Sequence, residues 1–512
     1  MNSVAIVYNT LIIAAIIAIF AGLWKIFEKA GEKGWKALIP FLNYWVLLEI
    51  TGKPKWWLVW AFIPIINLVI PFLLLIDIAK SFGHPGLGHQ TLAMLFPYVY
   101  LPWLGFSRKQ RYEGPGAELY RGVKKPAWRE WADAIVFAII AATFIRTFFV
   151  EAYKIPTASM EKTLLVGDHL FVSKFHYGAR FPMTPIAFPL AHHTLPLLNV
   201  KAFVDWIELP YYRLPGFTHV KSGDIVVFNF PAGDTVVKAQ QEMSYENLKR
   251  LRGGLDFKDD ELIWRPVDKR ENYVKRCVAT AGDTLLIKDA EVYLNGKLQP
   301  TPKMAQFAYR ISTRLPLGNS FFEEYGLLRS DVSGPSKMPG HNGYLYLIHT
   351  TISNIEKIKK LGFVKDAKRI IGENRDEYKY NLLYPHDHKK YPWNLDNFGP
   401  VWIPKKGVTI PLNDETWLFY KRCIKTYEHN RVERKDGTFY INGQESKSYT
   451  FRMNYYWMMG DNRHRSLDSR YWGFVPEDHI VGTPWFIWFS IDPDRKGLLE
   501  SIRWERIMKF VR

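Results

Sequence analysis

Two side chains in separate segments could together perform nucleophilic chemistry. Ser159 lies just after the turn-forming pair Ile155-Pro156, and Lys275 lies in YVKRCVA, residues 273–279, which has the composition of a strand. A serine hydroxyl becomes a nucleophile when a base takes its proton, and lysine is such a base only when burial keeps it neutral. In a strand, Lys275 would share a face with the ring of Tyr273. Taken alone, these residues fit a loop serine and a surface charge better.

The same serine also begins an S-x-x-K pattern that ends at Lys162, as in penicillin-binding proteins and β-lactamases. Lys221-Ser222-Gly223 is similar to the K-T/S-G motif of those enzymes. Their third motif lies between the other two, whereas the Y-x-N triplets of this chain begin at residues 293 and 440, after Lys221. The segment TLLVGDHLFV after the serine also predicts a strand, not a helix. Both differences count against this interpretation.

Four separated segments resemble the conserved boxes of bacterial type I signal peptidases (leader peptidases), which are membrane-anchored proteases with a serine–lysine dyad. They are IPTASMEKTLLVGD (155–168), SGDIVVFNFP (222–231), YVKRCVATAGD (273–283) and MMGDNRHRSLDSRYWGFVPEDHIVG (458–482). The four occur in the family's order and follow an apolar segment.

The resemblance implies catalytic roles for four residues. Ser159 would be the nucleophile that forms an ester acyl-enzyme, and Lys275 the general base. The backbone N–H of Ser159 and the hydroxyl of Thr157 would form the oxyanion hole, where each donor contributes about 3–4 kcal/mol. The hydroxyl of Ser466 would hold the lysine ammonium in line.

The resemblance also implies supporting and substrate-binding residues. An ion pair would join Asp468 and Arg470, and Asp461 would pair with Arg276. The GDNR motif comprises Gly460, Asp461, Asn462 and Arg463. Small pockets that admit alanine would be lined by Tyr153, Ile155, Pro156 and Val274. An extended substrate would add a strand at the edge of the site.

Several positions depart from the family pattern without touching the dyad. Lys162 stands where the family usually has proline, which predicts a changed turn after the nucleophile or a membrane contact. Ala158 replaces a common glycine, residues 279–281 replace Gly-x-Pro, and His464-Arg465 replaces Asp-Asn.

Strands and hairpins must position these residues. The sequence predicts strands at 224–230, 273–279, 291–294 and 438–441. The last two end in Asn-Gly within the near copies EVYLNGK and TFYINGQ, which predicts two similar hairpins around an insertion at 300–430. That insertion mixes helical stretches such as 355–362 with loops. We expect N-terminal transmembrane helices followed by a mainly β extracytoplasmic catalytic domain (signal-peptidase-like β fold) with an α+β insertion lobe.

The N-terminal region has the hydropathy of a membrane domain. Apolar stretches cover 4–24, 56–76, 91–106 and 131–150, and 38–50 is short enough to be interfacial or re-entrant. Residues 107–130 carry seven Lys or Arg residues and should be cytoplasmic. Four spans then place the N-terminus and everything after Glu151 outside, with Gly83 and Gly114 on opposite sides. The expected domains are 1–106, the basic loop 107–130, the helix 131–150, the catalytic parts 151–299 and 431–512, and the lobe 300–430.

Composition excludes several classes of protein. The chain has 512 residues, 48% hydrophobic, 16% aromatic and 23% charged, which excludes a disordered protein. Its net charge of +18 is explained better by topology signals than by nucleic-acid binding. Two cysteines exclude a disulfide scaffold, although one bridge between Cys277 and Cys423 stays open. No metal or other cofactor is expected, because the histidines at 169, 176, 192 and 193 lack ligand spacing.

The expected function is cleavage of N-terminal signal peptides from exported preproteins after small residues at −1 and −3. Ser159 can reach only about 30 Å beyond the helix that ends at Val150, so the bond to be cut would lie at the outer membrane surface. The expected location is the bacterial inner membrane with a periplasmic catalytic domain. The expected partners are preproteins, the lipid bilayer and the secretion translocon. Two alternatives are a catalytically silent scaffold or secretion accessory of the same fold, and a serine–lysine protease for regulatory membrane proteins.

Overall fold

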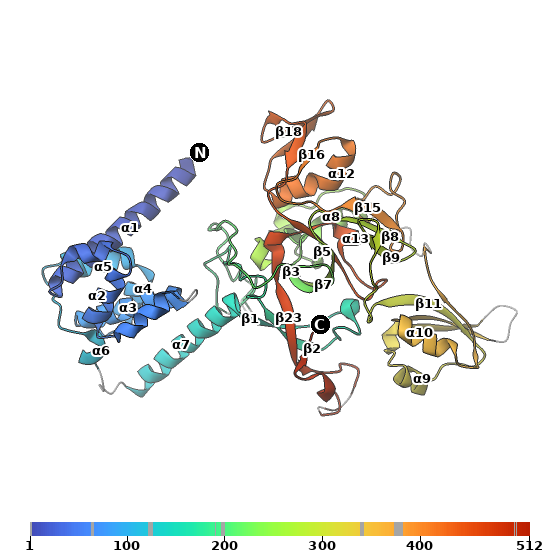
Figure 1. Ribbon diagram of the computed structural model, residues 1–512, viewed down its shortest axis with the longest axis horizontal. Coiled ribbons are helices and arrows are strands. Elements are labelled where there is room, and N and C mark those ends of the chain that lie inside the picture. Colours follow the sequence, from blue (N-terminus) through green and yellow to red (C-terminus); the bar gives the residue numbers. More distant parts are fainter. Residues whose placement is uncertain are drawn as a thin grey trace. The chain divides into compact units, whose positions relative to one another are not determined.

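The computed structural model describes residues 3–62, 66–120, 126–189, 191–195, 200–337, 343–372, 382–495, 497 and 499–511 (Figure 1). The contacts divide the chain into two compact units, Met1–Val136 and Phe137–Arg512. The boundary falls within helix α7. Each unit is described by itself.

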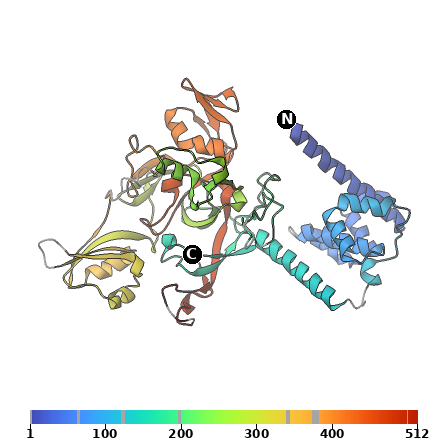
Figure 2. The same ribbon diagram turned by 180° about the vertical axis from the view of Figure 1, so that it is seen from behind.

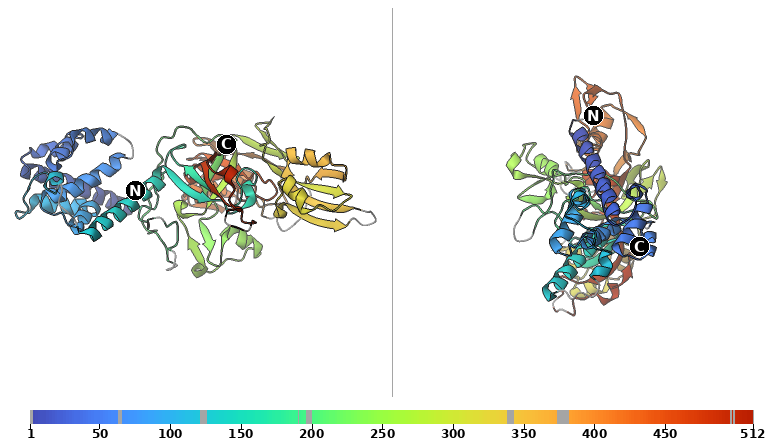
Figure 3. Two further views of the ribbon diagram at one scale, coloured as in Figure 1. Left: turned by 90° about the horizontal axis from the view of Figure 1, so that it is seen from below. Right: turned by 90° about the vertical axis from the view of Figure 1, so that its left-hand side faces the viewer.

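The first unit is helical in its described residues. Its apolar runs form α helices and short 3-10 helices around a core that includes Phe27, Leu48 and Leu104 (Figure 3). The elements are α1 (Ser3–Lys29), η1 (Gly34–Leu38), α2 (Leu42–Thr51), η2 (Lys55–Phe62), α3 (Ile66–Ser81), α4 (Leu87–Leu95), α5 (Pro97–Phe106), α6 (Gly116–Leu119) and α7 (Ala127–Phe148).

Two predicted spans are not continuous helices. The stretch 56–76 divides into η2 and α3, with residues 63–65 outside the described part of the chain, and 91–106 divides into α4 and α5. The second break falls where Pro97 occupies the first turn of α5, a position that suits proline because its missing N–H would have no helical partner. Over the described residues, no helix combines the length and the hydropathy that a bilayer crossing requires.

The predicted separation of Gly83 from Gly114 is wrong. The N–H of Glu113 donates to the carbonyl of Ser81 at 2.8 Å, and the N–H of Gly116 donates to the Ser81 hydroxyl at 2.9 Å. A side chain at Gly83 would meet the Glu113 carboxylate. The physical reason is that α4 and α5 pack against each other. The chain that leaves the end of α3 therefore returns to it after α5. Of the basic loop 107–130, residues 121–125 lie outside the described chain.

The second unit contains an antiparallel sheet whose strand order is β1-β2-β23-β3-β7-β21-β22, with β24 added beside β23 (Figure 1). The predicted strands at 224–230 and 273–279 are confirmed as β3 and β7. The bounds are β1 (Val150–Lys154), β2 (Asp168–Ser173), β3 (Ile225–Asn229), β7 (Asn272–Ala279), β21 (Tyr455–Met459), β22 (Val475–Pro476), β23 (Ile480–Ser490) and β24 (Lys509–Phe510).

A second β region contains the two similar hairpins. Asn295-Gly296 and Asn442-Gly443 all have positive φ, as a type I′ turn requires. In both hairpins the asparagine Oδ1 accepts a backbone N–H, from Thr284 at 2.8 Å and from Arg431 at 2.9 Å. The bounds are β8 (Thr284–Lys288), β9 (Glu291–Leu294), β10 (Lys297–Leu298), β15 (Phe398–Trp402), β16 (Thr409–Pro411), α12 (Asp414–Arg422), the π turn η7 (Cys423–Tyr427), β17 (Val432–Lys435), β18 (Thr438–Ile441), β19 (Gln444–Glu445) and β20 (Ser448–Thr450).

The predicted lobe 300–430 is in fact two structures. Its first part is an α/β lobe in which the sheet β12-β13-β11-β14 carries α9 and α10 on one face (Figure 2). Its later part belongs to the second β region, because β15 pairs with β8 and β16 with β20. Residues 338–342 and 373–381 lie outside the described chain. The lobe comprises β11 (Gln306–Thr313), α9 (Asn319–Glu324), β12 (Val332–Lys337), β13 (Tyr344–Thr351), α10 (Ile352–Lys359) and β14 (Val364–Arg369).

Short elements complete the second unit. A small sheet of order β5-β4-β6 carries α8, and 3-10 turns join the longer strands. The two cysteines, Cys277 and Cys423, are buried free thiols, so no disulfide joins them. The remaining bounds are η3 (Ala158–Met160), β4 (Thr235–Val237), β5 (Gln240–Ser244), α8 (Tyr245–Leu251), η4 (Asp259–Glu261), β6 (Leu262–Trp264), η5 (Val267–Lys269), η6 (Arg329–Asp331), α13 (Ser469–Trp472), η8 (Glu477–His479) and η9 (Trp504–Arg506).

Candidate active site

The structure brings Ser159 and Lys275 together. Ser159 lies in the short turn η3, which follows the edge strand β1, and Lys275 lies in β7. The Lys275 Nζ donates a hydrogen bond to the Ser159 Oγ at 2.6 Å. Both side chains are buried, with 3% of Lys275 and 8% of Ser159 exposed. The S-x-x-K alternative fails, because the residues after η3 lead into strand β2, not a helix.

Burial sets the protonation of this lysine. Desolvation lowers the pKa of Lys275 to about 8, and the carboxylates of Asp468 and Asp461 oppose that shift only in part. The Nζ also donates to the carbonyl of Val274 at 3.1 Å and lies 5.5 Å from the ring of Tyr273. A sizeable fraction of the amine is therefore neutral near pH 8, when it can accept a proton.

Thr157 and Ser466 surround the dyad in different ways. The Thr157 Oγ1 lies 3.4 Å from the Ser159 Oγ, and its side chain is exposed to an approaching ligand. Ser466 is 5% exposed, and its hydroxyl donates to the carbonyl of Leu467 at 3.4 Å. A side chain at Gly460 would clash with both the Ser466 hydroxyl and the Ser159 carbonyl. Ser466 therefore lies beside the nucleophile, but no described hydrogen bond joins it to Lys275.

The GDNR loop holds the backbone around the nucleophile. The N–H of Asn462 donates to the carbonyl of Ser159 at 3.1 Å, and its Nδ2 donates to the carbonyl of Ala158 at 3.1 Å. The expected ion pair is present: Arg276 donates to both oxygens of Asp461, at 2.8 and 2.7 Å. Arg276 thus connects β7 to the GDNR loop, which in turn holds the backbone at Ser159.

A second buried ion pair braces the same loop. Arg470 donates to both carboxylate oxygens of Asp468 at 2.9 and 2.7 Å, as expected, and its Nη2 donates to the carbonyl of Arg463 at 2.6 Å. Asp468 also accepts the N–H of Gly460 at 3.1 Å. Burial, followed by repulsion from Arg470, lowers the pKa of Arg463 to about 10. Removing either partner of the pair would leave a buried charge unpaired.

The four predicted substrate-binding residues lie near the nucleophile, on β1, β7 and the turn after β1. Ile155 belongs to a buried apolar cluster with Met160, and Tyr153 and Val274 pack against that cluster. Pro156 follows Ile155 and is exposed. Two strand edges flank this group: β1 ends the sheet, and β7 pairs with β21 only from Arg276 onward. Among the described strands, residues 272–275 therefore have no partner on the side of β21.

The sequence missed the contacts between the active site and the α/β lobe, although the departures from the family pattern marked them. Lys162 donates to the carbonyl of Gly326 in the lobe. Arg465 donates to the carbonyl of Ser330 at 2.8 Å. The His464 Nδ1 accepts the N–H of Ala308 in the lobe at 3.3 Å, so its Nε2 donates to the carboxylate of Asp396, 2.9 Å away and outside the lobe. The lobe therefore contacts both catalytic loops.

The backbone conformation at residue 162 explains why this chain does not have the proline that is usual in the family. The φ of Lys162 is +69°, in the left-handed region, whereas a proline ring fixes φ near −65°. The predicted change in the turn is therefore present. The expected membrane contact stays a prediction, and the described contact of the Lys162 ammonium is with Gly326 of the lobe.

Glu161 is a further residue that the sequence did not single out. It is 1% exposed, and its Oε2 has no hydrogen-bond partner among the described residues. Burial raises its pKa to about 7, and the Asp331 carboxylate of the lobe adds to the rise, while Lys162 opposes it. A carboxyl group two residues from the nucleophile therefore favours its neutral form.

Comparison with known proteins agrees with this geometry. The family model described as signal peptidase, peptidase S26 matches residues 128–342 and 447–489, half of the chain. The chain belongs to this signal peptidase family. The matched residues contain both members of the Ser159–Lys275 pair and the whole GDNR loop. Membership makes the protein a serine endopeptidase of the signal peptidase type.

Curated relatives agree with the family. The chain is 24% identical over 367 residues to a protein named signal peptidase I from Buchnera aphidicola subsp. Schizaphis graminum, covering 71% of this chain and 75% of the relative. It is 25% identical over 393 residues to the signal peptidase I of Helicobacter pylori, covering 74% and 91%. Residues 35–115 match a separate family of unknown function. The helical unit thus has its own relatives.

Proposed function

We propose that this protein cleaves N-terminal signal peptides from exported preproteins, with Ser159 as the nucleophile and Lys275 as the general base. The observation that carries the proposal is the 2.6 Å contact between the Lys275 Nζ and the Ser159 Oγ in buried surroundings. The neutral amine takes the hydroxyl proton as the oxygen attacks the scissile carbonyl. The ammonium then gives this proton to the leaving amine, and an ester joins Ser159 to the signal peptide.

Deacylation repeats the same transfers with water. Lys275 takes a proton from the water, the hydroxide attacks the ester, and the proton returns to the Ser159 Oγ. The oxyanion is bound by the backbone N–H of Ser159 and the hydroxyl of Thr157, which lies 3.4 Å from the Ser159 Oγ. Ser466, beside the nucleophile, orients the ammonium.

The substrate binds as an extended strand between β1 and β7, with small residues at −1 and −3. The free edges of β1 and of residues 272–275 support this, because backbone N–H and C=O groups there can pair with a peptide. The packed cluster at Tyr153, Ile155 and Val274 supports small pockets. Large side chains at −1 or −3 would displace buried groups.

The catalytic unit lies on the extracytoplasmic side of the bacterial inner membrane, with α1 and α7 in the bilayer. Two sequence features support this location: residues 4–24 carry no charge, and residues 107–130 are strongly basic. The contact between Glu113 and Ser81 puts the segments 80–90 and 107–116 at one level, which supports two spans, α1 and α7, in place of four. Lys29 donates to the carbonyls of Leu104 and Ser107 at 2.6 and 2.8 Å, so the ends of α1 and α5 share one side. The bilayer and the secretion translocon remain the proposed partners.

A preprotein assay tests the dyad. The purified full chain in detergent should release a signal peptide that ends in Ala-x-Ala from a model preprotein. The change in gel mobility of the preprotein measures this cleavage. Ser159→Ala and Lys275→Ala should each lower kcat by about 10³-fold or more, because nucleophile and base act as a unit. Lys425→Ala, at an exposed lysine distant in sequence, is the matched control. Full cleavage by either dyad variant would refute the assignment, and no cleavage by the wild type would favour a silent scaffold.

A further inference from the structure

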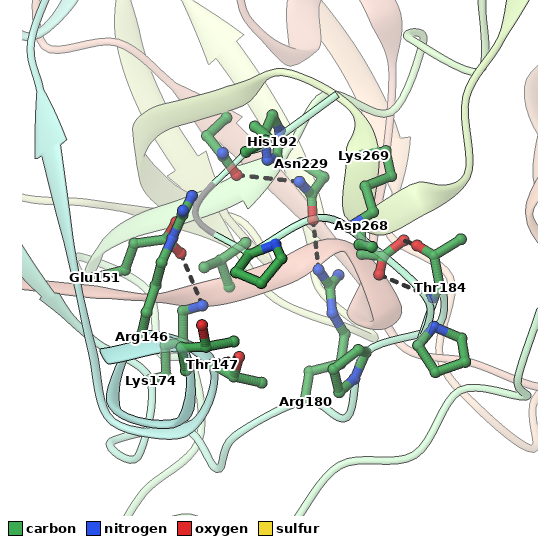
Figure 4. Close-up of a pocket in the computed structure, with 18 of the residues that line it drawn as sticks. Arg146, Thr147, Glu151, Lys174, Arg180, Thr184, His192, Asn229, Asp268 and Lys269 are labelled. Atoms are coloured by element: carbon green, nitrogen blue, oxygen red, sulfur yellow. Dashed lines mark hydrogen bonds and ion pairs between the residues drawn. The ribbon is translucent and has the colours of Figure 1, made fainter. Parts of the chain in front are cut away.

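A polar cavity lies where the second half of α7 joins the strands of the catalytic unit (Figure 4). Its volume is about 210 Å³. The last turns of α7 contribute Thr143, Arg146 and Thr147. Strands β1, β3, β7 and β23, the turn η5 and the segment that follows β2 contribute further walls. None of these residues belongs to the dyad or the GDNR loop.

The charges in the wall do not balance. Arg146 and Lys174 lie on one side of the cavity in Figure 4, and Arg180 projects from another. The charged side chains that line it are the cations Arg146, Lys174, Arg180 and Lys269 and the anions Glu151 and Asp268. Four cations against two carboxylates leave an excess of positive charge.

Both carboxylates are already engaged. Glu151 accepts hydrogen bonds from Arg146 at 2.7 Å and Tyr153 at 2.7 Å, and its Oε2 lies 2.8 Å from the Lys174 Nζ. Although burial acts in the opposite direction, Lys174 and Arg146 lower the pKa of Glu151 to about 2. The two oxygens of Asp268 accept the N–H and the hydroxyl of Thr184 at 3.0 and 2.5 Å.

Two of the cations have no carboxylate within ion-pair distance among the described residues. Arg180 donates to neutral acceptors, the Asn229 Oδ1 at 2.8 Å and the carbonyl of Asp478. The Lys269 side chain is 9% exposed, and the contact found for its ammonium is the Phe203 ring at 5.8 Å. The wall also contains the buried Thr143 Oγ1, which lacks a described hydrogen-bond partner. Asp268 attracts both cations, and Asp478 also attracts Arg180, but neither carboxylate lies within ion-pair distance. Burying cations without a close counter-charge is costly, so an anion that bound there would offset the cost.

We propose that this cavity binds a phosphate group, and that the phosphate belongs to a lipid headgroup. Phosphate oxygens accept several charge-assisted hydrogen bonds at once, which suits a wall of guanidinium, ammonium and hydroxyl groups. The lipid source rests on the proposed membrane placement of α7, whose last turn forms one wall. Phe188 in the wall is 59% exposed and its neighbour Ile186 50%, as expected beside acyl chains.

Binding is tested in the full-length Ser159→Ala chain, so that failure of the proposed cleavage cannot affect the result. In nonionic detergent, inorganic phosphate should raise Tm by about 2–4 °C relative to chloride at equal ionic strength. Arg180→Gln with Lys269→Gln should abolish the rise. Lys425→Gln with Arg434→Gln, which removes the same charge from exposed positions, should leave it intact. Circular dichroism establishes that each variant is folded. Arg146→Gln removes a cavity cation at a partly exposed position and should also reduce the rise in Tm, which tests the site independently of the double variant.

Vesicles distinguish the sources of phosphate. Reconstituted chain should take up phosphatidylglycerol preferentially over phosphatidylcholine from mixed vesicles, measured by lipid analysis after detergent extraction, and the cavity double variant should lose that preference relative to the exposed double variant. A phosphate effect on Tm without a lipid preference would overturn the headgroup assignment. No phosphate effect, or the same effect in both double variants, would overturn the site itself. Stabilisation by an acidic peptide alone would assign the cavity to substrate instead.

Discussion

The burial of Lys275 determines the pH at which the proposed general base is neutral. A lysine at its ordinary pKa of about 10.4 would be charged at neutral pH and could take no proton from Ser159. Desolvation lowers the pKa of Lys275 to about 8, so the neutral amine increases as the pH rises through that value. The chemistry of the dyad could be predicted from sequence because few residue types perform it. The depth of burial could not, because it depends on strands distant in the chain.

The pH dependence of cleavage follows from this pKa. We expect kcat/KM to increase about tenfold per pH unit below pH 8 and to level off above it, since the neutral lysine is the active form of the free enzyme. Initial rates on a model preprotein between pH 5 and 10 measure the profile. A rise centred above pH 10 would contradict a desolvated base.

Glu161 should destabilise the protein as the pH rises from acidic to neutral. Its folded pKa of about 7 is above the unfolded value of about 4.3, so folding favours the protonated form, and stability falls as the pH rises from about 4.3 to 7. Glu161→Gln removes this dependence. The free energy of unfolding of the variant, relative to that of the wild type, should rise by about 1–3 kcal/mol between pH 4.5 and pH 8. Thermal unfolding in detergent at the two pH values measures this difference. Glu445→Gln at an exposed position should show no such gain, and an equal change in both would refute the explanation.

At the scale of elements, the hairpins and strands were predictable and the lobe was not. Asn-Gly at both hairpin ends specifies a local turn, so β9 and β18 have the predicted bounds. The segment 398–430 has no such local signal, because β15 pairs with β8, more than a hundred residues earlier. The same long-range packing places Lys162 and Arg465 against the lobe. The lobe can thus affect the position of the loops around Ser159 and Ser466 without supplying residues to the site.

Lys162→Pro, which restores the residue usual in the family, should lower activity. Proline cannot adopt the φ of +69°, so the turn after Ser159 must rearrange at a cost of about 1–3 kcal/mol. We expect a loss of about tenfold or more in kcat. Lys162→Gly separates the two causes, because glycine keeps the backbone conformation but lacks the contact with Gly326. Wild-type cleavage by the proline variant would show that this turn does not position the nucleophile.

At the scale of the whole molecule, hydropathy located the helical unit, but it wrongly separated Gly83 from Gly114. Windows of apolar residues do not register the interruption at Pro97 or the packing of α4 on α5. The bonds from Glu113 and Gly116 to Ser81 depend on tertiary structure that no local pattern reveals.

Reporter fusions at Gly83 and Gly114 should therefore fall on the same side of the membrane. Both positions lie within one group of polar contacts, and a bilayer core of about 30 Å cannot separate them. Alkaline phosphatase activity in intact cells reports an extracytoplasmic fusion, and β-galactosidase activity a cytoplasmic one. A fusion after Ile491 controls for the proposed extracytoplasmic unit. Opposite readings at the two glycines would restore the four-span count.

The free edges of β1 and β7 also have a temporal consequence. A peptide can complete the sheet between them only if its own backbone groups are still unpaired. Polypeptide already folded around the cleavage point cannot enter. On the proposed binding mode, cleavage must therefore compete with folding of the exported polypeptide.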